Sequence, residues 1–231
     1  MLPQAAERIR TDLSADDEVL QVGGVAQPFG RADWVLDARP YEERGVAEGR
    51  ERFARRTWLV RDVCAREPWP FDDGRFAFAV CTTLATLRDP IGVCAELSRV
   101  ARAGYVEVPA IEAELAGGDG RWLCDVDHGE LVFVHKSVNV AADPRVRVPP
   151  RWHGRLTASE RVHALFWESR LPARERLADP AELVEELAER LRRRFEPSAA
   201  EVAVAEARVR LGGIAGAAAA RGLDALRGRN A

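Results

Sequence analysis

The sequence predicts an α/β protein built around a mostly parallel β-sheet. Short apolar segments recur along the first half of the chain, and most of them end at glycine, aspartate or threonine. A segment with helical spacing separates the last two, as in a strand–helix–strand unit. Parallel strands joined in this way are buried on both faces, so we expect a sheet covered on both sides.

Five strands are expected, at residues Glu18–Val22, Asp33–Leu36, Thr57–Val60, Phe76–Cys81 and Tyr105–Val108. Glycines follow the first strand, aspartates end the second and follow the third, and two threonines follow the fourth. Ligands of parallel α/β sheets bind beyond the carboxyl ends of the strands. These positions are therefore the first candidates for a binding site.

A helix is predicted between the fourth and fifth strands. Asp89 and Pro90 supply its start signal and Gly104 its stop signal. Its apolar face is formed by Ile91, Cys94, Leu97 and Val100.

An antiparallel hairpin is expected at Arg121–Lys136, at one edge of the sheet. Two alternating segments flank the sequence "DHGE", in which Gly129 can adopt the positive φ of a tight turn. For His128 we favour a turn residue over a catalytic one.

The rest of the chain is predicted to be helical. One helix is expected at Ala158–Leu171 and another after Asp179–Pro180, with its apolar stripe at Leu183, Leu187, Leu191 and Phe195. Residues 199–228 are alanine-rich and predict one or two weak helices. We therefore divide the chain into a Rossmann-like domain, 1–178, and a C-terminal helical extension, 179–231. The extension is expected to pack on the domain, to cover the site as a lid, or to join two subunits of a homo-oligomer, and the sequence does not choose among these.

Composition argues against several classes of partner. The formal net charge of −3 gives no strong field for nucleic acid or anionic lipid. No apolar segment approaches the length of about 20 residues that spans a bilayer, and the N-terminus lacks the apolar core of a signal peptide. We expect a cytoplasmic protein that binds neither nucleic acid nor membrane.

The four cysteines are scattered and form no C-x-x-C pair. A zinc site or a disulfide framework would require closer spacing. Buried free thiols and no metal site are expected at Cys64, Cys81, Cys94 and Cys124.

Two aspartates suggest a nucleoside ligand. A carboxylate at the end of the second strand, Asp37, can accept hydrogen bonds from both ribose hydroxyls, and Asp62 after the third strand can accept one from the adenine amine. Taken singly, each aspartate is explained better by helix capping or by loop solvation. Together with the glycine turn, they favour an adenosine-containing cofactor.

The segment Pro70–Pro109 resembles class I S-adenosylmethionine-dependent methyltransferases. It is most similar to a bacterial branch with the pattern "DP…C-x-E-L-x-R-V…G-Y-x-E-x-P", and the resemblance extends from Glu18 to Leu177. Arg121, Trp122, Glu130–Phe133 and Lys136 also match that branch. The resemblance implies a Rossmann-like methyltransferase fold with S-adenosylmethionine lying across the ends of the first, second and fourth strands.

The resemblance also implies the residues that hold this cofactor. The glycine pair would approach its methionine part, Asp37 its ribose and Asp62 its adenine, while Thr82 would face the sulfonium. The full implied set is Gly23, Gly24, Val25, Asp37, Ala38, Asp62, Val63, Thr82 and Thr83.

Several positions depart from the family pattern. Gln21 replaces an acid or a histidine, and Val25 replaces a third glycine, where a positive φ would be strained and the side chain would intrude on the cofactor. The family's Glu–His pair after the fourth strand is Ala85–Thr86, and two further polar positions are Ala77 and Gly120.

Two functional hypotheses follow. The first is a methyltransferase acting on a small molecule in a specialised biosynthetic pathway, derived from sugars or nucleosides. The alternative is a catalytically divergent protein of the same fold that binds an adenosyl ligand or a partner without methyl transfer. The weak candidates for a catalytic base are Glu107, His135 and His153.

Overall fold

The computed structural model describes residues 1–148, 154 and 156–195. It divides the chain into two units, Met1–Glu186 and Leu187–Ala231. Every described strand belongs to the first unit, and the fold below is that of this unit.

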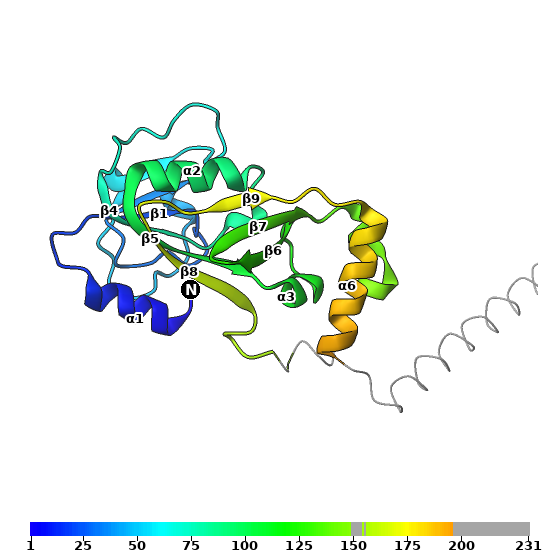
Figure 1. Cartoon of the computed structure of the whole chain (residues 1–231). Coiled ribbons are helices and arrows are strands. Elements are labelled where there is room, and N and C mark those ends of the chain that lie inside the picture. Colours follow the sequence, from blue (N-terminus) through cyan, green and yellow to red (C-terminus); the bar gives the residue numbers. More distant parts are fainter. Residues whose placement is uncertain (149–153, 155, 196–231) are drawn as a thin grey trace, which may run out of the picture. The chain divides into compact units, whose positions relative to one another are not determined.

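Six strands form the main sheet, in the order β3-β2-β1-β4-β5-β8, of which Figure 1 labels β1, β4, β5 and β8. The first five are parallel to one another, while β8 runs antiparallel to β5. This confirms the predicted α/β fold with a mostly parallel sheet. The strands are β1 Val19–Val22, β2 Trp34–Asp37, β3 Trp58–Val60, β4 Phe76–Cys81, β5 Ala101–Pro109 and β8 Val162–Glu168.

The predicted hairpin is confirmed, but its predicted position is wrong. Strands β6 (Trp122–Asp127) and β7 (Glu130–His135) pair antiparallel, and together with β9 (Ala173–Glu175) they form a separate three-stranded sheet. His128 and Gly129 take φ values of 49° and 83° in the turn, as a two-residue hairpin turn requires.

The edge of the main sheet is instead closed by β8, within a segment predicted to be helical. Its side chains alternate between the two faces: Phe166 packs against one core cluster and Trp167 belongs to the other. When both faces of an edge strand are covered, apolar side chains lie on each face. The sequence of such a strand then shows no clear alternation of apolar and polar residues. This hid the strand from the sequence pattern.

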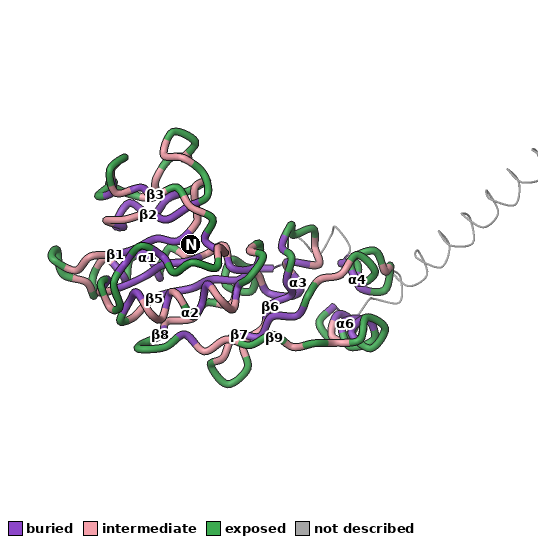
Figure 2. The backbone as a smooth tube through the Cα atoms, turned by 90° about the horizontal axis from the view of Figure 1, so that it is seen from above, coloured by how far each residue is buried: buried purple, intermediate pink, exposed green. Residues whose placement is uncertain are grey.

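The two faces of the main sheet bury separate apolar clusters. Helix α1 (Pro3–Asp12) contributes Ala5, Ala6 and Ile9 to one cluster, and α2 (Pro90–Val100) lies on the other face, where the second sheet also packs. Figure 1 shows α1 and α2 on opposite sides of the strands, and in Figure 2 much of the strand backbone is coloured as buried. The expectation of a sheet covered on both sides is confirmed.

Helix α2 begins as predicted but ends earlier. The carboxylate of Asp89 accepts the N–H of Gly92 at 2.8 Å. The chain then passes from Val100 directly into β5, and Gly104 lies inside that strand rather than at a helix stop. A Cβ at Gly104 would come within 2.5 Å of both the Ala79 carbonyl oxygen and the Trp167 ring, so this glycine permits close packing of neighbouring strands.

The connections from β1 to β2 and from β2 to β3 contain no α-helix. Residues 38–57 hold only the short 3-10 turns η1 (Tyr41–Glu43) and η2 (Arg55–Thr57). The two connections are joined by a β-bridge between Phe29 and Glu48, and the Gly30 N–H donates to the Glu48 carbonyl at 2.9 Å. Prolines and glycines in these segments disfavour helices, so loops replace them here.

The remaining helices and 3-10 turns of the described chain are η3 Leu84–Thr86, α3 Ile111–Leu115, α4 Val138–Ala142, η4 Pro144–Val146 and α6 Pro180–Arg194. Helix α6 starts at the predicted place, because the Asp179 carboxylate accepts the N–H groups of Ala181 and Glu182, and its predicted apolar stripe is buried. The predicted helices at 199–228 and His153 lie outside the described residues.

All four cysteines are free thiols, as predicted. Cys81, Cys94 and Cys124 are buried, while Cys64 is half-buried. Burial raises the pKa of the Cys124 thiol to about 12 and also raises that of Cys81, so both remain protonated. None of the described helices is both long enough and apolar enough to cross a bilayer.

Candidate cofactor site

The candidate site lies at the switch point of the main sheet. Strand β1 lies between β2 and β4, so the chain leaves β1 toward one side and returns at β4 on the other. The carboxyl ends of β1 and β4 therefore flank the crevice in which sheets of this type bind ligands. Gly23–Gly24 follows β1 and Thr82–Thr83 follows β4.

Both glycines of this loop need to be glycine. Gly23 and Gly24 have φ values of 70° and 85°, in the left-handed region. A Cβ at Gly23 would lie 2.3 Å from Thr83 Oγ1, and one at Gly24 would lie 2.2 Å from Gln21 Nε2. The glycine pair is thus accounted for by close packing against the chain's own side chains.

Val25, which follows the glycine pair, does not have the positive φ that would strain its backbone. Among the described residues, the non-glycine positions with positive φ are His128 and Ser169, so Val25 has ordinary backbone geometry. Its side chain packs, partly buried, against the cluster that contains Phe29. Because the left-handed turn ends at Gly24, the positive φ that would strain this valine does not occur.

Gln21 has a structural role in the same loop. It is buried at 3% exposure, and its Oε1 accepts the Phe29 N–H at 2.7 Å. The amide that replaces the family's acid or histidine therefore anchors the residues after the glycine turn.

Asp37, the proposed ribose-binding group, is already hydrogen-bonded within the chain. Its Oδ2 accepts the Val25 N–H at 3.2 Å, and its Oδ1 accepts the Arg39 N–H at 2.8 Å. The residue is only 6% exposed. Each oxygen keeps a second lone pair, but at this exposure little of the carboxylate reaches the surface. Ala38, the next residue, is exposed.

Asp62, the proposed adenine-binding group, turns toward a different set of partners. Its Oδ1 accepts the Cys64 N–H at 2.9 Å and its Oδ2 accepts Arg88 Nη2 at 3.0 Å. These donors, the backbone N–H first and Arg88 second, lower the pKa of the Asp62 carboxyl. Neighbouring Val63 is buried, and its carbonyl accepts Trp69 Nε1 at 3.0 Å.

The two threonines after β4 differ in their contacts. Thr83 lies over Gly23, and its Oγ1 is 3.7 Å from Cys81 Sγ. Thr82 is half-buried, and within the described chain its hydroxyl makes no hydrogen bond. Thr82 is therefore the polar side chain of this edge that is most available to a ligand.

The candidate bases are not brought together at this site. Glu107 is 6% exposed, accepts from the Tyr105 hydroxyl and the Leu2 N–H, and lies on the face of the sheet covered by α1. Burial, followed by the hydrogen bond to Glu107, raises the pKa of Tyr105. His135 is exposed, with its ring edge-on to Trp122 at 5.5 Å.

A histidine that the sequence pattern did not single out lies nearer the carboxyl edge of the sheet. His163 pairs with Val108 of β5, and its Nε2 is 3.5 Å from Asp125 Oδ1 of β6. The expected helix at Ala158–Leu171 hid this pair, because only the strand β8 places His163 beside the end of β5. The enrichment of valine, phenylalanine and tryptophan in β8 was the available signal.

The polar groups at this edge of the sheet match an adenosyl ligand in chemistry, although Asp37 is largely buried. Carboxylates end or follow β2 and β3, and hydroxyls follow β4, as such a ligand requires. The residues present therefore fit S-adenosylmethionine in chemistry, and Asp37, Asp62 and Thr82 are the ones that would hold it.

Comparisons with known proteins find similarity among solved structures. No protein-family model matches the sequence, and no curated protein matches it. One similar solved structure is an S-adenosylmethionine-dependent methyltransferase from Thermotoga maritima, provisionally assigned to histamine N-methylation, with 19% identity and a TM-score of 0.30. That likeness covers 48% of this chain and 52% of that protein, so the match spans about half of its length.

A second similar structure comes from Bacillus halodurans and carries a provisional methyltransferase assignment. It is 11% identical, with a TM-score of 0.34, and the likeness covers 71% of this chain and 93% of that one. Both likenesses are low in identity and in structural overlap, so function must be inferred from the site itself.

Proposed function

We propose that this chain binds S-adenosylmethionine at the carboxyl edge of β1, β2 and β4 and transfers its methyl group to a small molecule. The observation that carries the proposal is the switch point, where a left-handed glycine pair after β1 lies against Thr83 after β4, beside Asp37. Dinucleotide-binding and related α/β sheets bind their ligands at such a point.

The chain's own residues would mainly bind and orient. Asp37 would accept the ribose hydroxyls through its second lone pairs, Asp62 would accept the adenine amine, and Thr82 would present a hydroxyl toward the reacting end. When bound, the cofactor supplies an electrophilic methyl group on a positively charged sulfur. Positioning of the acceptor is then the main task of the protein.

The acceptor we propose is a small molecule of a specialised pathway derived from sugars or nucleosides, on the strength of the sequence resemblance alone. Self-association through residues 179–231 and a cytoplasmic location stay predictions. Light scattering of the full chain tests self-association, because a molar mass equal to that of a single chain would contradict it.

A second candidate function is favoured by the closed state of Asp37. Both of its oxygens are hydrogen-bonded to the backbone at 6% exposure, and both glycines pack against protein side chains. A protein that kept this fold but binds an adenosyl ligand or a partner without methyl transfer would have the same features.

Calorimetry with S-adenosylmethionine and its demethylated product tests the cofactor proposal. We expect saturable binding of both ligands by the full chain, and a loss of at least about tenfold in affinity in Asp37→Asn, since one charged hydrogen-bonding group is removed. Asp72→Asn is the matched control, because Asp72 is an exposed carboxylate that precedes β4, at the opposite edge of the sheet. The absence of binding to either ligand would contradict the proposal.

Transfer of a labelled methyl group separates the two functions. Methyl-labelled cofactor incubated with the protein and a panel of sugar- and nucleoside-derived acceptors should yield a labelled acceptor if the chain is an enzyme. Cofactor binding without label in any acceptor would favour the second candidate.

A further inference from the structure

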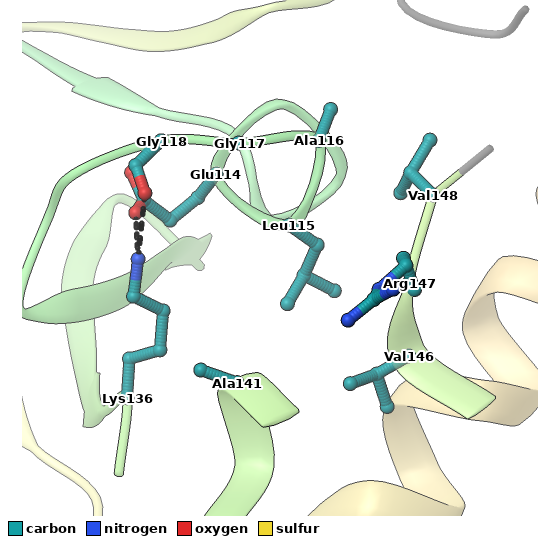
Figure 3. A pocket seen from close by; sticks show the side chains of 10 residues that line it. All are labelled: Glu114, Leu115, Ala116, Gly117, Gly118, Lys136, Ala141, Val146, Arg147 and Val148. Carbon is teal, nitrogen blue, oxygen red and sulfur yellow. Dashed lines mark hydrogen bonds and ion pairs between the residues drawn. The ribbon is translucent and has the colours of Figure 1, made fainter. Parts of the chain in front are cut away.

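A cavity lies beyond the carboxyl end of β5, outside the candidate cofactor site. Its volume is about 350 Å³, within the range of small-molecule pockets. It is formed by α3 and the loop after it, by the residue that follows β7, and by α4 and η4 (Figure 3). We call it the α3 cavity, and its main lining residues are Glu114, Leu115, Lys136, Val146, Arg147 and Val148.

One wall of the α3 cavity carries a buried ion pair. The Lys136 ammonium donates to the Glu114 carboxylate and, at 3.0 Å, to the Gly118 carbonyl. The Glu114 side chain is 2% exposed and that of Lys136 is 13% exposed. An ammonium has three N–H groups, so one of them has no acceptor within the described chain and can serve a ligand.

Lys136 is also the only lysine among the 34 basic residues of the chain. A lysine presents a compact point charge, whereas arginine presents a planar fork. Here the compact charge fits between a buried carboxylate and a loop carbonyl and still reaches the cavity.

The opposite wall carries a second cation. The Arg147 side chain lines the cavity (Figure 3), and in the part of the chain that the structure describes no carboxylate pairs with it. Arg145, two residues earlier, differs: it pairs with Asp143 and Glu185. Lys136 and Arg147 together outweigh Glu114 by one positive charge, so the cavity favours a single negative charge.

The rest of the lining is apolar or small. Leu115, Ala116, Ala141, Val146 and Val148 contribute hydrocarbon, and the Gly117–Gly118 segment contributes backbone. Apolar walls with a few convergent polar groups are typical of sites that orient a small ligand.

We propose that the α3 cavity binds a small monocarboxylic acid with a hydrocarbon or aromatic body. The carboxylate would lie between Arg147, whose fork matches it in geometry, and the free N–H of Lys136, while the body would contact Leu115 and the two valines. A single excess positive charge matches a carboxylate better than a phosphate dianion. This binding requires no cofactor, so it stands or falls separately from methyl transfer.

NMR titration of the full chain without cofactor tests this proposal, with benzoate, butyrate and hexanoate as probes. At least one carboxylate should cause saturable shifts at the Gly117 and Gly118 amides and none at Gly74, which precedes β4 at the opposite edge of the sheet. Benzamide, the uncharged counterpart of benzoate, should bind at least about tenfold more weakly, because the charge-assisted hydrogen bonds are lost.

Two arginine variants locate the charge that matters. Arg147→Gln should weaken carboxylate binding about tenfold and leave benzamide binding unchanged. Arg145→Gln should leave both unchanged, since Arg145 is not among the lining residues. The proposal is overturned by a failure of all three carboxylates to saturate, by equal affinity for benzamide or inorganic phosphate, or by unchanged affinity in Arg147→Gln.

Discussion

The glycine loop after β1 and the α3 cavity beyond β5 both lie on the carboxyl side of the main sheet, yet their polar groups are satisfied differently. In the glycine loop, Asp37 accepts two backbone N–H groups, and Gln21 and Thr83 fill the space beside the glycines. In the α3 cavity, among the residues that the structure describes, one ammonium N–H of Lys136 has no acceptor and no carboxylate pairs with Arg147.

A sequence motif therefore locates candidate residues, but it does not establish that a ligand can reach them. Glycines and carboxylates at strand ends serve a ligand or the protein's own backbone equally well. The availability of a polar group depends on which other groups the fold brings to it.

The largest expected effect concerns the ion pair of the α3 cavity. Lys136→Met should lower the free energy of unfolding by about 3 kcal/mol, because it leaves the Glu114 carboxylate buried without a counter-charge. The double variant Lys136→Met with Glu114→Leu should recover most of this loss. Urea unfolding of the three proteins measures it, and equal losses in the single and double variants would show that the pair is not the cause.

The next effect tests how tightly the glycine loop is packed. Gly23→Ala should cost about 2 kcal/mol, because an unfavourable left-handed φ is combined with a clash against Thr83 Oγ1. Gly74→Ala is the matched control: its φ is 62°, and nothing lies within 4 Å of an added Cβ. It should cost only about 1 kcal/mol.

Thermal or urea unfolding compares these two glycine variants. Combining Gly23→Ala with Thr83→Ala should bring the cost of the Gly23 change toward that of Gly74. If both glycine changes cost the same, the loop is not closed by Thr83 and the contrast between the two regions weakens.

A smaller effect compares the two aspartates of the cofactor site. Asp37→Ala should cost about 1–2 kcal/mol, because the Val25 and Arg39 N–H groups lose their acceptor. Asp62→Ala should change the free energy of unfolding by no more than about 0.5 kcal/mol, since its side chain is 54% exposed. The reverse order would mean that Asp37 is open to a ligand rather than used for loop stability.

The smallest effect is electrostatic. The Cys64 N–H and Arg88 lower the pKa of Asp62, so the ionised carboxylate stabilises the fold above its unfolded pKa, and this contribution is lost as the pH falls through the folded value. In Arg88→Gln, carboxyl NMR should show this pKa rising while remaining below its usual value, because the backbone donor stays. Added salt should shrink the difference between the two proteins; an unchanged pKa would remove Arg88 as a cause.

Much of the fold could be predicted from local patterns. Strand β4 has the predicted bounds, and helix α2 starts where Asp89 and Pro90 place it. The cap and the apolar stripe of α6 were also readable, because both depend on residues within a few positions of one another. Only part of the candidate site could be predicted: the sequence placed Gly23 and Asp37 at strand ends, but not the hydrogen bonds that occupy them.

Local sequence patterns were enough to predict the five parallel strands of the main sheet, the order of glycine and aspartate along them, and the hairpin turn at His128–Gly129. These follow from short-range steric and hydrogen-bonding preferences that neighbouring residues carry with them. Three features came to light only in the folded chain: β8 closes the sheet, Asp37 accepts hydrogen bonds from nearby backbone N–H groups, and Lys136 meets Glu114 beside a cavity. Those outcomes join residues far apart in the chain, where packing and the pairing of buried charge, rather than local preference, select the contact.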